Sequence, residues 1–134
     1  MAIALAYQAT HTGHLALTEA GREAVLRHTT LVVIHVVSAI DLDNTEAFAA
    51  GISDEIARVV AEAGLRGLEW RLRLTTAKDD VELAGAVLAV VEEVGAELLV
   101  IGARRRSPVG KLLLGSSAQS MILQADVPVL TVKS

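Results

Sequence analysis

The sequence predicts an α/β fold, a single doubly wound, Rossmann-like domain built on a five-stranded parallel sheet. Short apolar runs, the pattern of strands buried on both faces, alternate along the chain with segments whose apolar residues recur at helical spacing. Five expected strands alternate with four expected helices. That order implies parallel strands joined by right-handed crossovers, with helices on both faces of the sheet.

Length and composition narrow the class of protein. The chain has 134 residues, which suits one domain with a sizeable core, so we assign residues 1–134 to one unit. Hydrophobic residues make up 52% of the chain but aromatic residues only 2%, so the core must be aliphatic. Cysteine is absent, which excludes disulfides, thiolate chemistry and Cys-based metal sites.

The same counts bear on location and partners. No apolar run approaches membrane-spanning length, and the first residues lack the pattern of a signal peptide, so we expect a soluble cytoplasmic protein that binds no membrane. The formal net charge of −4 argues against nucleic acid as a partner.

The expected strands differ in their patterns. The second is the strongest because it is rich in β-branched residues. The third alternates apolar and polar residues, which indicates a strand with one wet face at a sheet edge. Pro128 indicates an edge or a strand start for the last one. The expected strands cover residues 3–7, 31–37, 68–74, 98–101 and 127–132.

The expected helices begin at polar residues, and two of them end at glycine. Asp79 and Asp80 suit a first helical turn, where the helix dipole favours negative charge. Gly64 and Gly95 are typical residues just past a helix end. We expect a polar loop over residues 8–13 before the first helix. The four expected helices cover about residues 14–27, 45–64, 79–95 and 115–125.

The stretch from Glu97 to Ser117 predicts an anion site. A buried apolar strand ends at Gly102, a basic loop follows, and a helix begins near Gly115. The first N–H groups of a helix lack internal partners and attract phosphate, and glycines let the backbone approach a ligand closely. Ser116 or Ser117 caps the helix or donates a hydroxyl to phosphate. The alternative is an ordinary strand-to-helix connection with solvated arginines and a capping serine.

The residues from Val100 to Ser116, followed by those from Ala125 to Val132, resemble the C-terminal signature of the universal stress protein family. The resemblance covers essentially the whole chain. It implies a sheet of order 3-2-1-4-5 and a homodimer joined through the last strand, from Val127 to Val132. In the family's ATP-binding branch, the loop and the helix N-terminus hold the phosphates, and the ends of the first two strands hold the adenosine.

Carried to this chain, the resemblance assigns strand-end residues to a nucleotide and loop residues to its phosphates. The assigned residues are Tyr7, Gln8, Val36, Ile101, Gly102, Arg104, Arg105, Lys111, Gly115, Ser116 and Ser117. Two of them depart from the family pattern. Arg105 replaces the middle glycine of Gly-x-x-Gly-x9-Gly-Ser/Thr and offers a guanidinium to phosphate instead. Gln8 replaces an aspartate and keeps hydrogen-bonding groups without the charge.

We therefore expect a stress-response module that binds ATP or a related adenine nucleotide at the C-terminal rim of the sheet, with or without Mg²⁺. The alternative is a nucleotide-free dimeric interaction or signalling protein in which arginine side chains fill the pocket. An enzyme of similar fold, such as an adenylating enzyme or an electron-transfer flavoprotein subunit, is a third interpretation. No general base or nucleophile emerges, so we expect at most slow, incidental ATP hydrolysis.

The sequence does not predict a metal site at the histidines. His11 and His14 are three residues apart, but no carboxylate lies on their helical face and no cysteine completes a metal site. We interpret both as surface or capping residues. His28 falls at a helix end, where a cation suits the dipole, and we expect His35 to be a hydrogen-bonded histidine of the core or rim.

Overall fold

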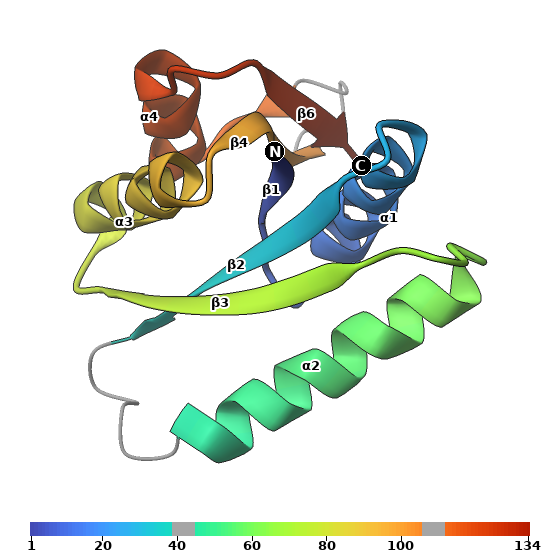
Figure 1. Cartoon of the computed structure of the whole chain (residues 1–134). Coiled ribbons are helices and arrows are strands. Elements are labelled where there is room, and N and C mark those ends of the chain that lie inside the picture. The colour runs from blue at the N-terminus through green and yellow to red at the C-terminus, as the bar shows by residue number, and fades with distance from the viewer. Residues whose placement is uncertain (39–44, 106–111) are drawn as a thin grey trace.

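A computed structural model of the chain shows a twisted sheet with helices on both faces (Figure 1). The structure describes residues 1–38, 45–105 and 112–134. In chain order the elements are β1 (Ala2–Ala6), α1 (His11–Leu26), β2 (Thr30–Ser38), α2 (Thr45–Glu62), β3 (Trp70–Ala77), α3 (Asp80–Glu93), β4 (Ala96–Arg105), β5 (Leu112–Leu113), α4 (Ser116–Gln124) and β6 (Val129–Lys133).

Five strands pair in parallel in the order β3-β2-β1-β4-β6. This confirms the doubly wound sheet of order 3-2-1-4-5, with β6 as its fifth strand. β3 lies at one edge of the parallel sheet, as its alternating pattern predicts. The sequence did not predict β5, a two-residue strand that pairs antiparallel with the end of β4, where Arg105 faces Leu112.

The helices enclose two aliphatic cores, one on each face of the sheet. Residues of α1 and α2 pack on one face, and residues of α3 and α4 pack on the other. Neighbouring residues of β4 point to opposite cores, Val100 to the first and Ile101 to the second, and both are essentially inaccessible to solvent. Burying an aliphatic side chain of this size contributes about 1.5–3 kcal/mol, so the cores supply much of the stability.

Two predicted boundaries at the carboxyl edge of the sheet are wrong. α1 begins at His11 rather than near His14, because the Thr10 hydroxyl caps the helix by accepting the Gly13 N–H at 3.0 Å. β4 does not end at Gly102 but continues to Arg105. Its extension is paired, since Gly102 lies opposite Val132 of β6.

Smaller differences concern the edge strands. β3 covers residues 70–77 rather than 68–74, because its register with β2 starts where Leu31 pairs with Trp70. Pro128 lies directly before β6, which confirms the predicted strand start, and its carbonyl accepts the Leu99 N–H at 3.0 Å. Gly64 and Gly95 follow α2 and α3 with φ of 67° and 65°, the left-handed conformation that glycine favours.

Gly13 fixes how closely α1 approaches the end of β1. A Cβ atom at this position would lie 1.7 Å from the Gln8 carbonyl oxygen, so no larger residue fits without moving the turn between β1 and α1. The Gln8 carbonyl in turn accepts the Thr10 N–H at 2.9 Å. The first turn of α1 is therefore packed directly against the backbone that leaves β1.

We expect Gly13→Ala to lower the free energy of unfolding by about 2 kcal/mol or more, because the added methyl overlaps backbone that must shift. Urea denaturation followed by circular dichroism measures the change. Gly85→Ala is the matched control, since Gly85 lies within α3 and a methyl added there would have no atom within 4 Å. That substitution should stabilise the protein by about 0.5–1 kcal/mol. Equal effects of the two substitutions would contradict the packing argument.

Candidate functional site

Two adjoining pockets open where β1, β2 and β4 end. The inner pocket has a volume of about 120 Å³ and is lined by Ala6, Tyr7, Gln8, Thr10, Thr12, Gly13, Ile34, His35, Val36, Leu83, Val87, Ile101, Gly102, Ser117, Ala118 and Met121. The outer pocket has a volume of about 530 Å³ and is lined by Gln8, Thr10, Thr12, Asp80, Gly102, Ala103, Arg104, Leu114, Gly115, Ser116, Ser117 and Ala118. Because six residues line both, the two pockets lie side by side.

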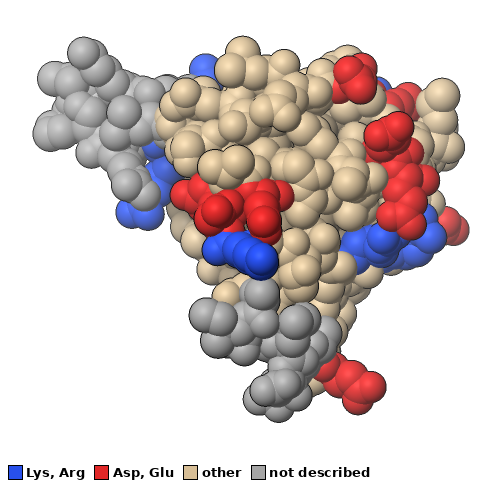
Figure 2. All heavy atoms as spheres, turned by 90° about the vertical axis from the view of Figure 1, so that its left-hand side faces the viewer, with Lys and Arg blue, Asp and Glu red and all other residues tan. Residues whose placement is uncertain are grey.

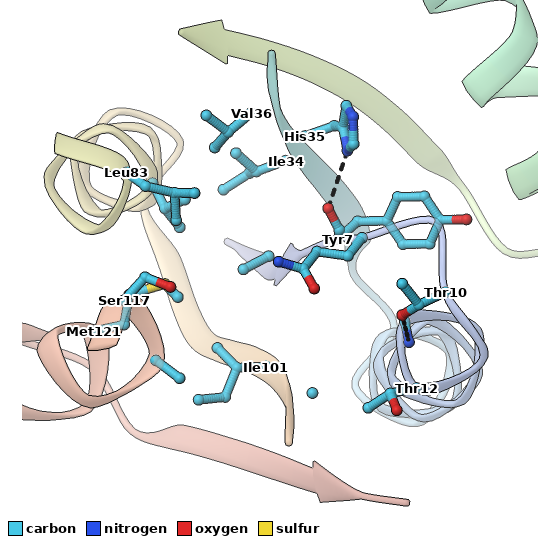
Figure 3. Close-up of a pocket in the computed structure, with 16 residues that line it drawn as sticks. Tyr7, Thr10, Thr12, Ile34, His35, Val36, Leu83, Ile101, Ser117 and Met121 are labelled. Atoms are coloured by element: carbon cyan, nitrogen blue, oxygen red, sulfur yellow. Dashed lines mark hydrogen bonds between the residues drawn. The ribbon is translucent and has the colours of Figure 1, made fainter. Parts of the chain in front are cut away.

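The inner pocket is mainly apolar. Ile34 and Val36 of β2 lie on one side of it, and Ile101 of β4 lies on another (Figure 3). Leu83 of α3 and Met121 of α4 close the third side. An apolar pocket with a few polar groups is typical of a small-molecule site.

Two helix N-termini lie at the outer pocket. Thr10 and Thr12 bring the first turn of α1, and Gly115 and Ser116 bring the first turn of α4. Among the described residues no side chain caps the α4 terminus, where the first N–H groups of a helix lack partners within the helix. N–H groups of this kind and the helix dipole attract anions.

Charge at this edge of the molecule is local. Figure 2 shows the side where β2 and β3 end: both acidic and basic atoms lie on it, and most of its described surface is uncharged. In the outer pocket the described charged residues are Arg104, which is exposed, and Asp80 at the start of α3. The arrangement therefore offers a small anion site rather than a broad basic surface.

The two glycines of the predicted anion loop have different roles. A Cβ atom on Gly102 would lie 2.9 Å from Thr12 Cγ2, so glycine here allows α1 to pack on β4. Gly102 also lines both pockets, and its role toward a ligand stays a prediction. Gly115 has no atom within 4 Å of the corresponding position. Its φ of −64° suits any residue, so the missing side chain keeps the α4 terminus open.

A partly buried polar contact lies beside the inner pocket, and the sequence interpretation missed it. Tyr7 donates its hydroxyl hydrogen to Glu55 Oε1 at 2.7 Å, and His14 Nε2 lies 2.5 Å from the same oxygen. His14 is therefore half-buried and bonded to α2, so its interpretation as a surface or capping residue is wrong. Because a carboxylate only accepts, Nε2 carries the hydrogen.

The contact shifts the pKa values of both of its acidic groups, the Glu55 carboxyl and the Tyr7 hydroxyl. The hydrogen bond from His14, and then the one from Tyr7, holds the pKa of Glu55 below its ordinary value of 4.5. Burial first, and then the hydrogen bond to Glu55, raises the pKa of Tyr7 well above its ordinary value of 10.0. At neutral pH the pair is therefore an ionised carboxylate and a neutral phenol that donates to it.

His35 behaves as predicted for a hydrogen-bonded histidine at the rim. Its Nδ1 donates to the Tyr7 carbonyl at 3.0 Å, a contact visible in Figure 3. Its ring packs against Phe48 of α2, with ring centres 5.7 Å apart. His28 follows α1 with φ of 53°, the left-handed residue that ends the helix.

Most of the residues assigned from the sequence lie at the two pockets. Those lining one or both are Tyr7, Gln8, Val36, Ile101, Gly102, Arg104, Gly115, Ser116 and Ser117. Arg105 ends β4, but the structure describes only its backbone, and Lys111 lies outside the described residues.

The assignment missed pocket residues contributed by helices. Leu83 and Met121 belong to apolar helical stripes that look like ordinary core positions, so no local signal marks them. Thr10 could have been found, because a threonine before an apolar-periodic segment is a typical helix start. Across residues 1–38, 45–105 and 112–134, no group of three or more His, Cys, Asp or Glu side chains could hold a metal. No helix in these ranges combines the length and apolar character needed to span a membrane.

The model of the universal stress protein family matches residues 1–133 of the chain. A universal stress protein of Mycolicibacterium smegmatis is 38% identical over 131 residues, which span 98% of this chain and 96% of that protein. Both chains are thus matched over nearly their whole length.

Solved structures agree on the fold. The structure of a universal stress protein from Archaeoglobus fulgidus has 28% identity and a TM-score of 0.73, with 98% of this chain and 97% of that chain covered. A universal stress protein in complex with cAMP has 20% identity and a TM-score of 0.73, with 99% and 96% covered. At that lower identity, the second match supports the fold alone.

We expect the Tyr7–Glu55–His14 contact to stabilise the protein in a pH-dependent way. The pKa of Glu55 is lower in the folded chain than its unfolded value of 4.5, so the ionised carboxylate stabilises the fold above that pH. This stabilisation is lost as the pH falls through the folded-state pKa. The difference in unfolding free energy between the parent and Glu55→Gln should therefore be full at neutral pH and shrink in acid.

Urea titrations of both proteins at about pH 7, 5, 4 and 3 measure this difference. Glu62→Gln is the control, because Glu62 forms an exposed ion pair with Arg58 on the same helix and should contribute little at any pH. A parent-to-variant difference that stays constant from neutral pH to acid would contradict the assignment.

Proposed function

The chain belongs to the universal stress protein family, and from this premise we propose that it binds an adenine nucleotide at the carboxyl edge of its sheet. The observation that carries the proposal is that an apolar inner pocket adjoins an outer pocket at two helix N-termini. A nucleotide has the same division, a flat base joined through a ribose to phosphate. We choose adenine as the base because a universal stress protein of similar fold has been solved in complex with cAMP.

In this proposal the base lies in the inner pocket. Val36 and Ile101 offer apolar contact at the ends of two strands, and Met121 offers it from α4. Gln8 lines both pockets, so its amide group is placed near the junction of base and ribose. An amide can donate to one ribose or base atom and accept from another, which an aspartate at this position could not do.

The phosphates lie in the outer pocket at the start of α4. The backbone N–H groups there, the Ser116 and Ser117 hydroxyls and the Arg104 guanidinium are the groups that would bind them. The pocket volume of about 530 Å³ is in the usual range for ligand sites. The roles assigned to Arg105 and Lys111 stay predictions that rest on the family resemblance.

We propose ATP as one nucleotide that the site accepts, with Mg²⁺ as its companion. Asp80 is the carboxylate that the described residues bring to the outer pocket. Its negative charge opposes a triphosphate, and a divalent cation between them would offset that repulsion. The cytoplasmic location and the absence of efficient catalysis stay predictions.

The first test is calorimetric titration with ATP and Mg²⁺ at low salt, using the parent and Gly115→Val. We expect the parent to bind at micromolar concentration and the variant to bind at least about tenfold more weakly, because a branched side chain would cover the α4 terminus. The extended backbone of Gly115 suits valine, so the variant should fold.

Gly51→Val is the matched control, since it places the same side chain on α2 with no atom within 4 Å and away from both pockets. Its affinity should equal that of the parent. A parent that binds no nucleotide and copurifies with none would overturn the proposed function. The nucleotide-free interaction protein would then be the better interpretation.

We also propose a homodimer through β6. β6 pairs with β4 along one side, and among the described strands none covers its other side. Its residues from Val129 to Val132 are only half-buried, so the strand offers an apolar edge and an open row of backbone groups. Light scattering at micromolar concentration should give about twice the chain mass of 14.1 kDa. A monomeric mass would refute the dimer proposal and leave nucleotide binding untouched.

A further inference from the structure

The Tyr7–Glu55–His14 contact lies behind the nucleotide pockets, on the face of the sheet covered by α1 and α2. The Tyr7 ring packs with that core, and its hydroxyl points away from Leu83, Ser117 and Met121 (Figure 3). Glu55 lines neither pocket. Any influence of this glutamate on a ligand must therefore pass through the two residues it bonds, Tyr7 and His14, and through the turn between β1 and α1.

Three separate elements meet at the Tyr7 side chain. Glu55 belongs to α2, 48 residues further along the chain, and His14 belongs to the first turns of α1. The His14 ring stacks on the Tyr7 ring with centres 6.3 Å apart, and the His35 ring approaches it from β2 at 6.1 Å. Glu55 Oε1 accepts from both Tyr7 and His14, so this one atom joins α2 to α1 and to the residue that follows β1.

The backbone of Tyr7 connects its side chain to the pockets. Its N–H donates to the Ile34 carbonyl at 2.8 Å, and its carbonyl accepts from His35 at 3.0 Å. The next residue, Gln8, lines both pockets, and its carbonyl rests against Gly13. We expect a shift of the Tyr7 ring to move Gln8, because the turn between β1 and α1 is tightly packed against Gly13.

We propose that Glu55 is a positioning residue for nucleotide binding: by holding Tyr7 and His14 together, it sets where Gln8 stands at the junction of the two pockets. The inference rests on the proposed function and deepens it, since it assigns to α2 a part in ligand affinity. The carboxylate suits this role because one ionised oxygen accepts two hydrogen bonds, each stronger than a bond between neutral groups.

The groups around Glu55 support an ionised carboxylate. Arg58, one turn further along α2, adds positive charge near it and also pairs with Glu62. His14 faces it from α1, and Tyr7 faces it from the position directly after β1. His35 faces Tyr7 from β2 but donates to a backbone carbonyl, so it holds the turn independently of Glu55.

The test compares two half-ligands by calorimetry at neutral pH: adenosine, which needs the inner pocket and Gln8, and pyrophosphate, which needs the start of α4 and Arg104. We expect Glu55→Ala and Tyr7→Phe each to weaken adenosine binding by about fivefold to tenfold, as for a lost hydrogen bond to a charged group. Pyrophosphate affinity should change by less than about twofold, because α4 packs on the opposite face of the sheet from Glu55.

Two further variants separate positioning from general stability. The double variant should lose no more adenosine affinity than either single one, since both break the same path. Glu55→Gln should recover most of the affinity, because its amide oxygen can still accept from Tyr7 and His14. Glu62→Gln, an exposed change on the same helix, is the matched control and should bind both ligands as the parent does. Thermal unfolding of every variant checks that each is folded at the titration temperature.

The outcomes distinguish the two proposals. If the parent binds adenosine but Glu55→Ala and Tyr7→Phe bind it equally well, the positioning role is overturned and the proposed function stands. Equal losses for adenosine and pyrophosphate would also overturn it, since they would show a merely structural effect. If the parent binds neither half-ligand nor an adenine nucleotide, the proposed function fails and the positioning role fails with it.

Discussion

The burial of β1 and β4 on both faces is the constraint on which the rest of the structure depends. Ile3, Ala4 and Leu5 of β1 are fully buried, as are Leu99 and Val100 of β4. Strands without a wet face must pair all of their backbone groups and must be covered by helices on both sides. Parallel pairing then follows, because each crossover helix carries the chain from the carboxyl edge back to the edge where the strands begin.

That return explains why a ligand site forms at the carboxyl edge. Each helix that follows a strand begins at this edge, so the first turns of α1 and α4 both reach the outer pocket. The two N-termini come together because β1 and β4 are neighbours in the sheet. Gly13 and Gly102 permit the close approach, since a side chain on either would meet the Gln8 carbonyl or Thr12. The anion site is thus a consequence of sheet topology and of two tightly packed glycines.

The two faces of the sheet have different roles at β1. The face covered by α3 and α4 leaves the apolar inner pocket, and the face covered by α1 and α2 holds the Tyr7 side chain and its bonds to Glu55 and His14. Successive side chains of a strand point to opposite faces. The end of β1 can therefore present backbone and Gln8 to a ligand while Tyr7 anchors it from behind. In this arrangement, α2 is tied to the site without lining it.

The sequence by itself determined the alternation of strands and helices, and family resemblance added the sheet order. The sequence also predicted that a glycine and two serines stand at the start of α4. Helical periodicity and helix-start residues are signals that lie within a few positions of each other. Only the tertiary structure decided which residues of other helices and strands lie at or beside the site. Leu83 and Met121 look like core residues locally, Glu55 lies 41 residues from His14, and the close approach of Thr12 to Gly102 joins α1 to β4. The physical reason is that such contacts arise when distant segments pack, and no pattern within one segment records which partner it meets.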